Sequence, residues 1–257
     1  MLLAIDVGNT QIAIGMFRAD ELVGHWRFST HPERTVDEMR WELLGVFSLD
    51  GFTPKDVGGV CISSVVPAVT GQLRTVAPDL TRGDVVVVEP GVPTGMPVQI
   101  DNPREVGADR IVNSLAARER YGAPAIVVDF GTSTNFDVVG AEGAYLGGAI
   151  APGLEISTDA LISGTAALRR VEFVPPRSPI GKGTVEAIQS GTLYGHAGLV
   201  DGILQRIADE LGGDPARIAT GGLAATIVPF CRTVDVIDEF LTLEGLRLVY
   251  ERNREGA

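Results

Sequence analysis

Basic residues and cysteine are scarce in this sequence. Its 257 residues include 21 Lys and Arg against 33 Asp and Glu, which gives a formal net charge of −12. A nucleic-acid-binding surface needs clustered cations, so this composition argues against a nucleic-acid partner. Cys61 and Cys231 are the only cysteines and stand far apart, which excludes a disulfide framework and a cysteine-rich zinc site. The three histidines do not have metalloprotease spacing.

Long apolar runs are missing as well. The first apolar run stops at Asp6 and has no basic segment before it, unlike a secretory signal peptide. No later window approaches the roughly 20 apolar residues that cross a bilayer. We therefore expect a soluble, cytoplasmic protein with no membrane partner. Hydrophobic residues make up 45% of the chain, enough for a large buried core.

The sequence begins twice in the same way. The apolar run 2–5 ends in Asp6-Val7-Gly8-Asn9-Thr10, and the run 125–128 ends in Asp129-Phe130-Gly131-Thr132-Ser133. Alternating apolar residues follow each turn, so both copies predict a strand, a tight turn and a second strand. The offset of 123 residues carries Asp6 onto Asp129 and Gly8 onto Gly131.

This duplication predicts two related α/β domains, 1–122 and 123–257, each a mixed sheet with flanking helices, and a cleft between them. Periodicity and end signals predict the remaining elements. We expect helices over 35–47, 103–121, 184–211 and 242–254, buried strands at 60–62 and 85–88, a further strand at 218–219, and a loop over 91–103.

The repeated turn has residue types that suit a phosphate group. Glycine lets the backbone approach a ligand, successive N–H groups can receive phosphate oxygens, and the aspartate can hold a hydrated Mg²⁺ ion. An ordinary hairpin turn explains either copy alone. Two copies favour loops that hold one polyphosphate from both sides. Other nucleotide motifs fail: Gly follows Lys182 where a P-loop needs Ser or Thr, and no dinucleotide fingerprint follows the first strand.

The segment Asp101 to Arg110 is a second candidate. Gly107 inside the predicted helix 103–121 costs about 1 kcal/mol relative to alanine, so it needs a packing or ligand reason. Asp109 could accept a proton from a hydroxyl nucleophile, and Arg110 could bind a carboxylate or a phosphate. A helical ion-pair network with Glu105 is the alternative explanation of these charges.

Five motifs together closely resemble the type III pantothenate kinase family, over nearly the whole chain and in the family's order. They are DVGNT at 6–10, DNPREVGADR at 101–110, DFGTSTNFD at 129–137, GGAIAPG at 147–153 and GKGTVEAIQSG at 181–191. The resemblance implies a duplicated actin-like (ribonuclease H-like) fold of the acetate kinase, sugar kinase, Hsp70 and actin superfamily, with ATP in the cleft. It also implies ATP-dependent phosphorylation of pantothenate to 4′-phosphopantothenate, the first step of coenzyme A synthesis.

The resemblance also implies roles for individual residues. ATP is expected on Asp6, Val7, Gly8, Asn9, Thr10 and Gln11 of the first loop and on Gly131 and Thr132 of the second. Asp129 is expected to bind a monovalent cation, K⁺ or NH₄⁺, and Asp6 to hold Mg²⁺, directly or through water. Pantothenate is expected on Ile100, Gly107, Ala108, Asp109, Arg110 and Thr184, with Asp109 as the proton acceptor.

Two positions depart from the family pattern, and several alternatives stay open. Ile100 stands where many members have tyrosine, and Asn135 where threonine is common. A glycine stripe in the predicted helix 184–211 fits either packing within the chain or, as the resemblance implies, a homodimer. The rival functions are a non-catalytic accessory or regulatory protein on the same fold, a polyphosphatase-like enzyme, and a kinase for another hydroxy acid.

Overall fold

The computed structural model describes residues 1–255, which form two five-stranded sheets with the same strand order. In each sheet the first strand is central and pairs antiparallel with the second, and the third strand adds antiparallel outside the second. The fourth and fifth strands pair parallel on the other side of the first.

The first sheet contains β1 (Leu2–Val7), β2 (Gln11–Arg18), β3 (Glu21–Ser29), β4 (Gly59–Ser64) and β5 (Asp84–Val87). The second contains β6 (Ala125–Phe130), β7 (Ser133–Val139), β8 (Tyr145–Pro152), β9 (Ala216–Thr220) and β10 (Val236–Ile237). The predicted duplicated α/β fold is confirmed.

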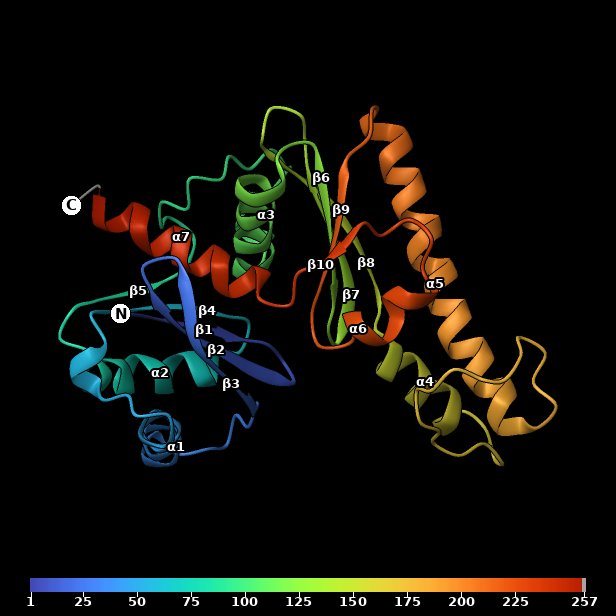
Figure 1. Cartoon of the computed structure of the whole chain (residues 1–257), viewed down its shortest axis with the longest axis horizontal. Helices are drawn as coiled ribbons and strands as arrows, with labels where there is room; N and C mark the ends of the chain where they lie inside the picture. The colour runs from blue at the N-terminus through green and yellow to red at the C-terminus, as the bar shows by residue number, and fades with distance from the viewer. Residues whose placement is uncertain (256–257) are drawn as a thin grey trace. The chain divides into compact units, whose positions relative to one another are not determined.

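The first sheet lies in unit 1, which comprises residues 1–97, 101–116 and 240 onwards. Side chains alternate along β1, so Leu3 and Ile5 pack against α1 (Val36–Leu49) and α2 (Pro67–Leu80). Leu2 and Ala4 point to the other face, where α3 (Ala108–Tyr121) and α7 (Leu241–Glu255) cover the sheet. Figure 1 shows this pair of helices above the blue strands and α1 and α2 below them. Both faces of the central strand β1 are therefore covered.

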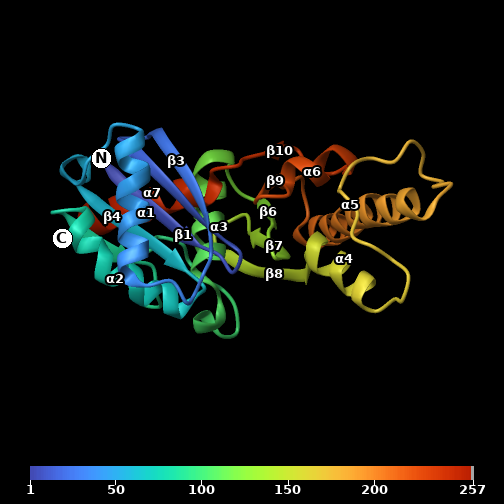
Figure 2. The same cartoon turned by 90° about the horizontal axis from the view of Figure 1, so that it is seen from below.

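The second sheet lies in unit 2, residues 98–100 and 117–239. Ile126, Val128 and Phe130 of β6 pack against the long helix α5 (Thr184–Leu211) and the short helix α6 (Ala224–Ile227). The helix α4 (Leu154–Ser163) follows β8 and lies beside α5 (Figure 2). Three short 3₁₀ helices complete the described elements: η1 (Pro54–Asp56), η2 (Pro103–Glu105) and η3 (Val228–Phe230).

The compact units divide the chain differently from the expected domains 1–122 and 123–257. The division falls at residues 116/117, inside α3, and the C-terminal helix α7 belongs to unit 1. A glycine explains how α7 reaches its place: a Cβ atom on Gly245 would overlap the carbonyl group of Val112 in α3. The two helices therefore approach to backbone contact, which the sequence offset does not reveal.

Two predicted elements need correction. The helix expected over 103–121 is broken: η2 ends at Glu105 and α3 begins at Ala108, so Gly107 precedes the helix and carries no helix-interior cost. The strand at 85–88 is not fully buried, because β5 is the outermost strand of its sheet and Val85 is 37% exposed. Other predicted elements are confirmed, including α5 with the expected bounds and α1, which Thr35 caps together with Glu38.

Substituting Gly245 by alanine should destabilise the protein by about 1–3 kcal/mol, because the new methyl group forces α7 away from α3. Gly45 in α1 is a matched control, since a Cβ atom there meets nothing within 4 Å. Gly45→Ala should stabilise the protein by about 0.5–1 kcal/mol through the unfolded state. Urea unfolding measures both, and an equal response of the two variants would contradict the close packing.

Candidate active site

The first repeated turn joins β1 to β2 through the exposed residues after Val7. The N–H group of Gly8 donates to the carbonyl oxygen of Gln11 at 2.9 Å, which closes a loop over residues 8–10. Thr30, the residue after β3, holds this loop twice: its hydroxyl donates to the Gly8 carbonyl at 2.7 Å and its N–H to the Thr10 carbonyl at 2.9 Å. Asn9, Thr10 and Gln11 are exposed, so their polar groups can meet a ligand.

Asp6 stands one residue before the end of β1, on the sheet face that α3 and α7 cover. The buried hydroxyl of Ser63 donates to its Oδ1 atom at 2.5 Å. The contact follows from the parallel register, which places Ser63 of β4 directly beside Asp6. Our sequence reasoning missed Ser63. The one available signal is that it directly follows the predicted strand 60–62.

The second turn matches the first, with one residue fewer. Phe130 ends β6 and Ser133 begins β7, so residues 131 and 132 alone form the loop, and the Gly131 N–H donates to the Ser133 carbonyl at 3.0 Å. The residue after the third strand again holds the loop, since Gly153 N–H donates to the Thr132 carbonyl at 3.2 Å. The two repeats are therefore offset by 123 residues before the turn and by one residue fewer after it. The strand pairs show this change, because Asp6 lies opposite Ala13 and Asp129 lies opposite Asn135.

Asp129 lies in this unit at the place that Asp6 has in unit 1. Its neighbours in register are Asn135 across the antiparallel pair and Thr220 across the parallel pair. Gly221 follows with φ of +91°, and a Cβ atom there would overlap the Oδ1 atom of Asp129. The absence of a Cβ atom lets the Asp129 carboxylate lie against the backbone of Gly221. The departure at Asn135 thus lies directly opposite the expected cation ligand.

Asp109 occupies the first turn of α3. Its Oδ1 atom is buried and finds no hydrogen-bond partner among the residues that the structure describes. Burial raises the pKa of this carboxyl group, an effect that the Arg110 backbone amide and the Arg110 charge partly offset. A raised pKa makes a carboxylate a better proton acceptor. The carboxylate folds back over Gly107, where a Cβ atom would overlap Oδ1. This close approach is the reason for glycine at position 107.

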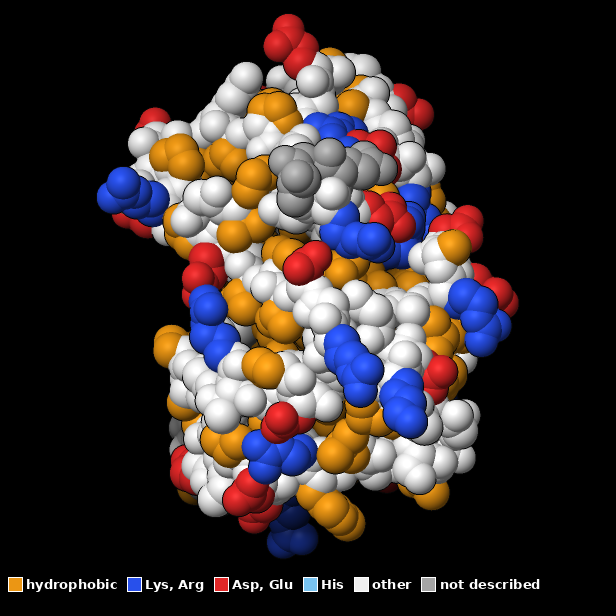
Figure 3. All heavy atoms as spheres, turned by 90° about the vertical axis from the view of Figure 1, so that its left-hand side faces the viewer, with side chains coloured by type: hydrophobic (Ala, Val, Ile, Leu, Met, Phe, Trp, Pro, Cys, Tyr) orange, Lys and Arg blue, Asp and Glu red, His pale blue; other side chains and the backbone are white. Residues whose placement is uncertain are grey.

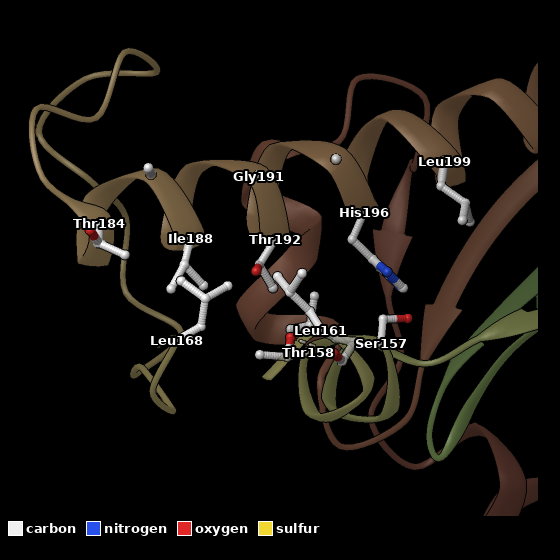
Figure 4. Close-up of a pocket in the computed structure, with 13 residues that line it drawn as sticks. Ser157, Thr158, Leu161, Leu168, Thr184, Ile188, Gly191, Thr192, His196 and Leu199 are labelled. Carbon is white, nitrogen blue, oxygen red and sulfur yellow. Dashed lines mark hydrogen bonds between the residues drawn. The ribbon is translucent and has the colours of Figure 1, made fainter. Parts of the chain in front are cut away.

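The other expected substrate residues lie in different parts of the chain. Ala108 and Arg110 flank Asp109 at the start of α3 in unit 1. Ile100 belongs to unit 2, where its Cγ2 atom lies 3.5 Å from the position of a Cβ on Gly147 in the GGAIAPG motif. Thr184 begins α5 and lines a pocket of about 540 Å³ between α4 and α5 (Figure 4). The ligand contacts of these residues stay predictions.

Within unit 1 the structure brings two candidate groups to one side of the sheet. Asp6 has the same parity along β1 as Leu2 and Ala4, which pack against α3 and α7. Asp109 stands at the start of α3, so the loop carboxylate and the proposed base share this face. Glu105 accepts a hydrogen bond from the Asn102 side chain at 2.6 Å, which gives it a local role in η2.

Figure 3 shows the charged side chains on one face of the molecule. On the face shown in Figure 3, lysine and arginine side chains are interspersed with acidic ones and do not form a continuous basic patch. None of the helices in residues 1–255 combines the length and the apolar character that crossing a membrane requires.

Both units contain a five-stranded mixed sheet with the same strand order, and each has an aspartate and a glycine turn at the end of its first strand. This arrangement defines the duplicated actin-like class of proteins. Solved structures share this fold. One is a Campylobacter jejuni protein assigned to the Baf family of transcriptional activators, with a TM-score of 0.61, 16% identity, and 98% and 99% of the two chains covered. Another is component A of the (R)-2-hydroxyglutaryl-CoA dehydratase of Acidaminococcus fermentans, with a TM-score of 0.59, 14% identity, and 100% and 99% covered.

Sequence comparison is more specific than the fold. A family model described as type III pantothenate kinase matches residues 2–206. The type III pantothenate kinase of Acidothermus cellulolyticus is 55% identical over 261 residues, which cover 98% of this chain and 99% of that one. The chain belongs to the type III pantothenate kinase family, and it is a kinase.

Gly107→Ala should lower turnover without unfolding the protein, because the new methyl group displaces the Asp109 carboxylate. A misplacement of about 1 Å at a catalytic group costs on the order of 10²-fold in rate. Gly71→Ala in α2 is the control, since a Cβ atom there meets nothing within 4 Å. Normal turnover by Gly107→Ala would contradict the proposed contact between Gly107 and the reacting carboxylate.

Proposed function

We infer that the protein transfers the γ-phosphoryl group of ATP to the primary hydroxyl of pantothenate, which yields 4′-phosphopantothenate and ADP. The observation that carries this inference is the 55% identity to a type III pantothenate kinase over nearly the full length of both chains. Phosphorylation of pantothenate is the first step of coenzyme A synthesis. The groups that the reaction needs are available in the two units.

We propose that the two turns bind the phosphates of ATP. The first turn exposes the polar residues Asn9, Thr10 and Gln11. The contacts from Thr30 and Gly153 hold the Gly8 and Gly131 turns in place before a ligand arrives. Donors that are already fixed need little reorganisation when charge develops on the transferred group. Asp6, Val7, Gly8, Asn9, Thr10 and Gln11 form the first contact set, and Gly131 and Thr132 form the second.

Asp109 is the proposed proton acceptor. A primary alcohol is a poor nucleophile near neutral pH, so a carboxylate within hydrogen-bond reach helps as its proton leaves. The buried, unpartnered Oδ1 atom and the raised pKa support this role. Arg110 is proposed to bind the substrate carboxylate or a phosphate, and Gly107, Ala108, Ile100 and Thr184 to complete the pantothenate contacts.

The residues present fit the two cations that the family implies. Mg²⁺ in kinases takes one or two carboxylates together with phosphate oxygens and water, and Asp6 supplies such a carboxylate, directly or through water. For a monovalent cation, Asp129 offers an oxygen in the space that the missing Cβ of Gly221 leaves. When bound, these cations supply positive charge that offsets the phosphates in a protein of net charge −12.

The rival functions lack a comparable observation. The Campylobacter jejuni protein assigned as a transcriptional activator is 16% identical, a likeness that carries the fold alone. A polyphosphatase would leave the segment from Gly107 to Arg110 without a substrate to bind. Both are outcomes of the assay that follows, as is the third rival, a kinase for another hydroxy acid.

Purified protein with MgATP and K⁺ should form ADP only when pantothenate is added, and removal of K⁺ should lower the rate. Asp109→Asn should reduce kcat by on the order of 10²–10⁴-fold while ATP binding is retained, because the variant loses only the proton acceptor. Asp101→Asn, an exposed change in the same segment, is the control and should keep normal turnover. ATP turnover that ignores pantothenate would contradict the function, and normal turnover by Asp109→Asn would contradict the base.

We also propose that the protein is a homodimer through α5. Gly191, Gly195 and Gly198 lie on one face of this helix, and a Cβ atom on any of them meets nothing within 4 Å. Packing within the described chain therefore does not explain these glycines. The exposed apolar side chain of Leu161 in α4 lines the same pocket as Gly191 and Gly195. A second copy could approach closely along this face.

Gly195→Glu should convert the dimer into a monomer, because it places a long charged side chain where the partner helix is expected. Gly71→Glu introduces the same side chain at an exposed glycine of α2 and should leave the dimer intact. Sedimentation or light scattering gives the mass of each variant. A wild-type monomer, or a Gly195→Glu dimer as strong as the wild type, would contradict the proposed interface.

A further inference from the structure

We propose that His196 is a positioning residue for the second phosphate loop and acts on it through Thr134. The proposal rests on the proposed function, which assigns ATP to this loop. His196 lies in the middle of α5, and Thr134 is the second residue of β7, directly after the turn. Neither residue has a role in the proposed phosphoryl transfer itself.

The contact between the two side chains is short and shielded from water. The Nε2 atom of His196 lies 2.9 Å from the Oγ1 atom of Thr134. Thr134 is 1% exposed and His196 is 7% exposed. A buried polar group that loses its partner pays the full cost of desolvation, so this hydrogen bond favours one placement of β7 over others.

Thr134 is tied to the loop through the strand pair. It stands opposite Phe130 in the register of β6 and β7, so these two residues bracket Gly131 and Thr132. The Phe130 ring also lies against the His196 ring, with centroids 6.2 Å apart. Holding Thr134 therefore fixes the point at which the loop returns to the sheet.

Three helices hold this hairpin in different ways. Gly153, the residue before α4, donates its N–H group to the Thr132 carbonyl, and Leu223, the residue before α6, donates its N–H group to the Phe130 carbonyl, each at 3.2 Å. The α5 contact is the one made between side chains, so substitution can remove it while the backbone contacts remain. Substitution of His196 therefore changes how the loop is held without changing any residue of the loop itself.

Histidine suits this position better than an apolar residue of similar size. Burial lowers the pKa of His196, so the ring is neutral near pH 7 and one of its nitrogens can share a hydrogen bond with the Thr134 hydroxyl. Figure 4 shows the ring extending from α5 toward Ser157 of α4, on the wall of the pocket. A leucine would fill much of the volume and leave Thr134 without a partner. A glutamine carries a polar atom at a similar distance from the backbone.

A double-mutant cycle tests the coupling in the full-length protein. The variants are His196→Leu, Thr134→Val, the two combined, and His196→Gln as the conservative replacement. Calorimetry gives the dissociation constant of MgATP, steady-state kinetics give the KM values for ATP and pantothenate, and thermal unfolding gives Tm. Thr134→Val keeps the shape of the side chain, so it tests the contact even where His196→Leu does not fold.

Each single change that breaks the contact should weaken ATP binding by about tenfold, the size of one buried hydrogen bond. The double variant should be no weaker than either single variant, because both remove the same interaction. His196→Gln should bind ATP within about threefold of the wild type, and the KM for pantothenate should stay within twofold throughout.

Two results would overturn the proposal. One is a fall in Tm with unchanged ATP affinity, which is the signature of a purely structural contact. The other is an additive loss in the double variant. A wild type that binds ATP but does not phosphorylate pantothenate would contradict the proposed function alone, because the affinity comparison still tests His196. A wild type that binds no ATP would contradict both.

Discussion

In each unit a central strand is hydrogen-bonded on both sides. Its next-to-last residue is an aspartate, and a glycine directly follows its last residue. The antiparallel neighbour requires a tight turn at this point, and the parallel neighbour places a hydroxyl residue, Ser63 or Thr220, beside the carboxylate. The residue after the third strand then donates its N–H group to the turn. The positions of both candidate phosphate loops follow from this pattern of strand pairing.

The same arrangement explains how an acidic chain can bind an anionic nucleotide and an anionic substrate. Excess carboxylates at the ends of the central strands are suited to cations, and the turns that follow present N–H donors. Burial raises the pKa of Asp109, and its buried Oδ1 atom has no hydrogen-bond partner among the described residues, which supports its proposed role as proton acceptor.

The sequence was enough to predict the duplication, both turns, most helices and the family, because these depend on local patterns and on motifs. The break before Ala108 was not predicted, because the residues from Pro103 to Tyr121 read as one helix and Gly107 was placed inside it. Other contacts join residues that are far apart in the chain: Ser63 with Asp6, His196 with Thr134, and helix α7 with helix α3. Such contacts leave no periodic signal, so only a three-dimensional structure reveals them.

The central claim is that Asp109 accepts the proton of a hydroxyl group while the two turns hold the phosphates of ATP. A crystal structure with a non-hydrolysable ATP analogue, Mg²⁺ and pantothenate tests it most directly. We predict that the primary hydroxyl of pantothenate lies within about 3.2 Å of an Asp109 carboxylate oxygen, with phosphate oxygens on the Gly8 and Gly131 turns. A hydroxyl group directed to another side chain, or phosphates bound away from either turn, would contradict the account.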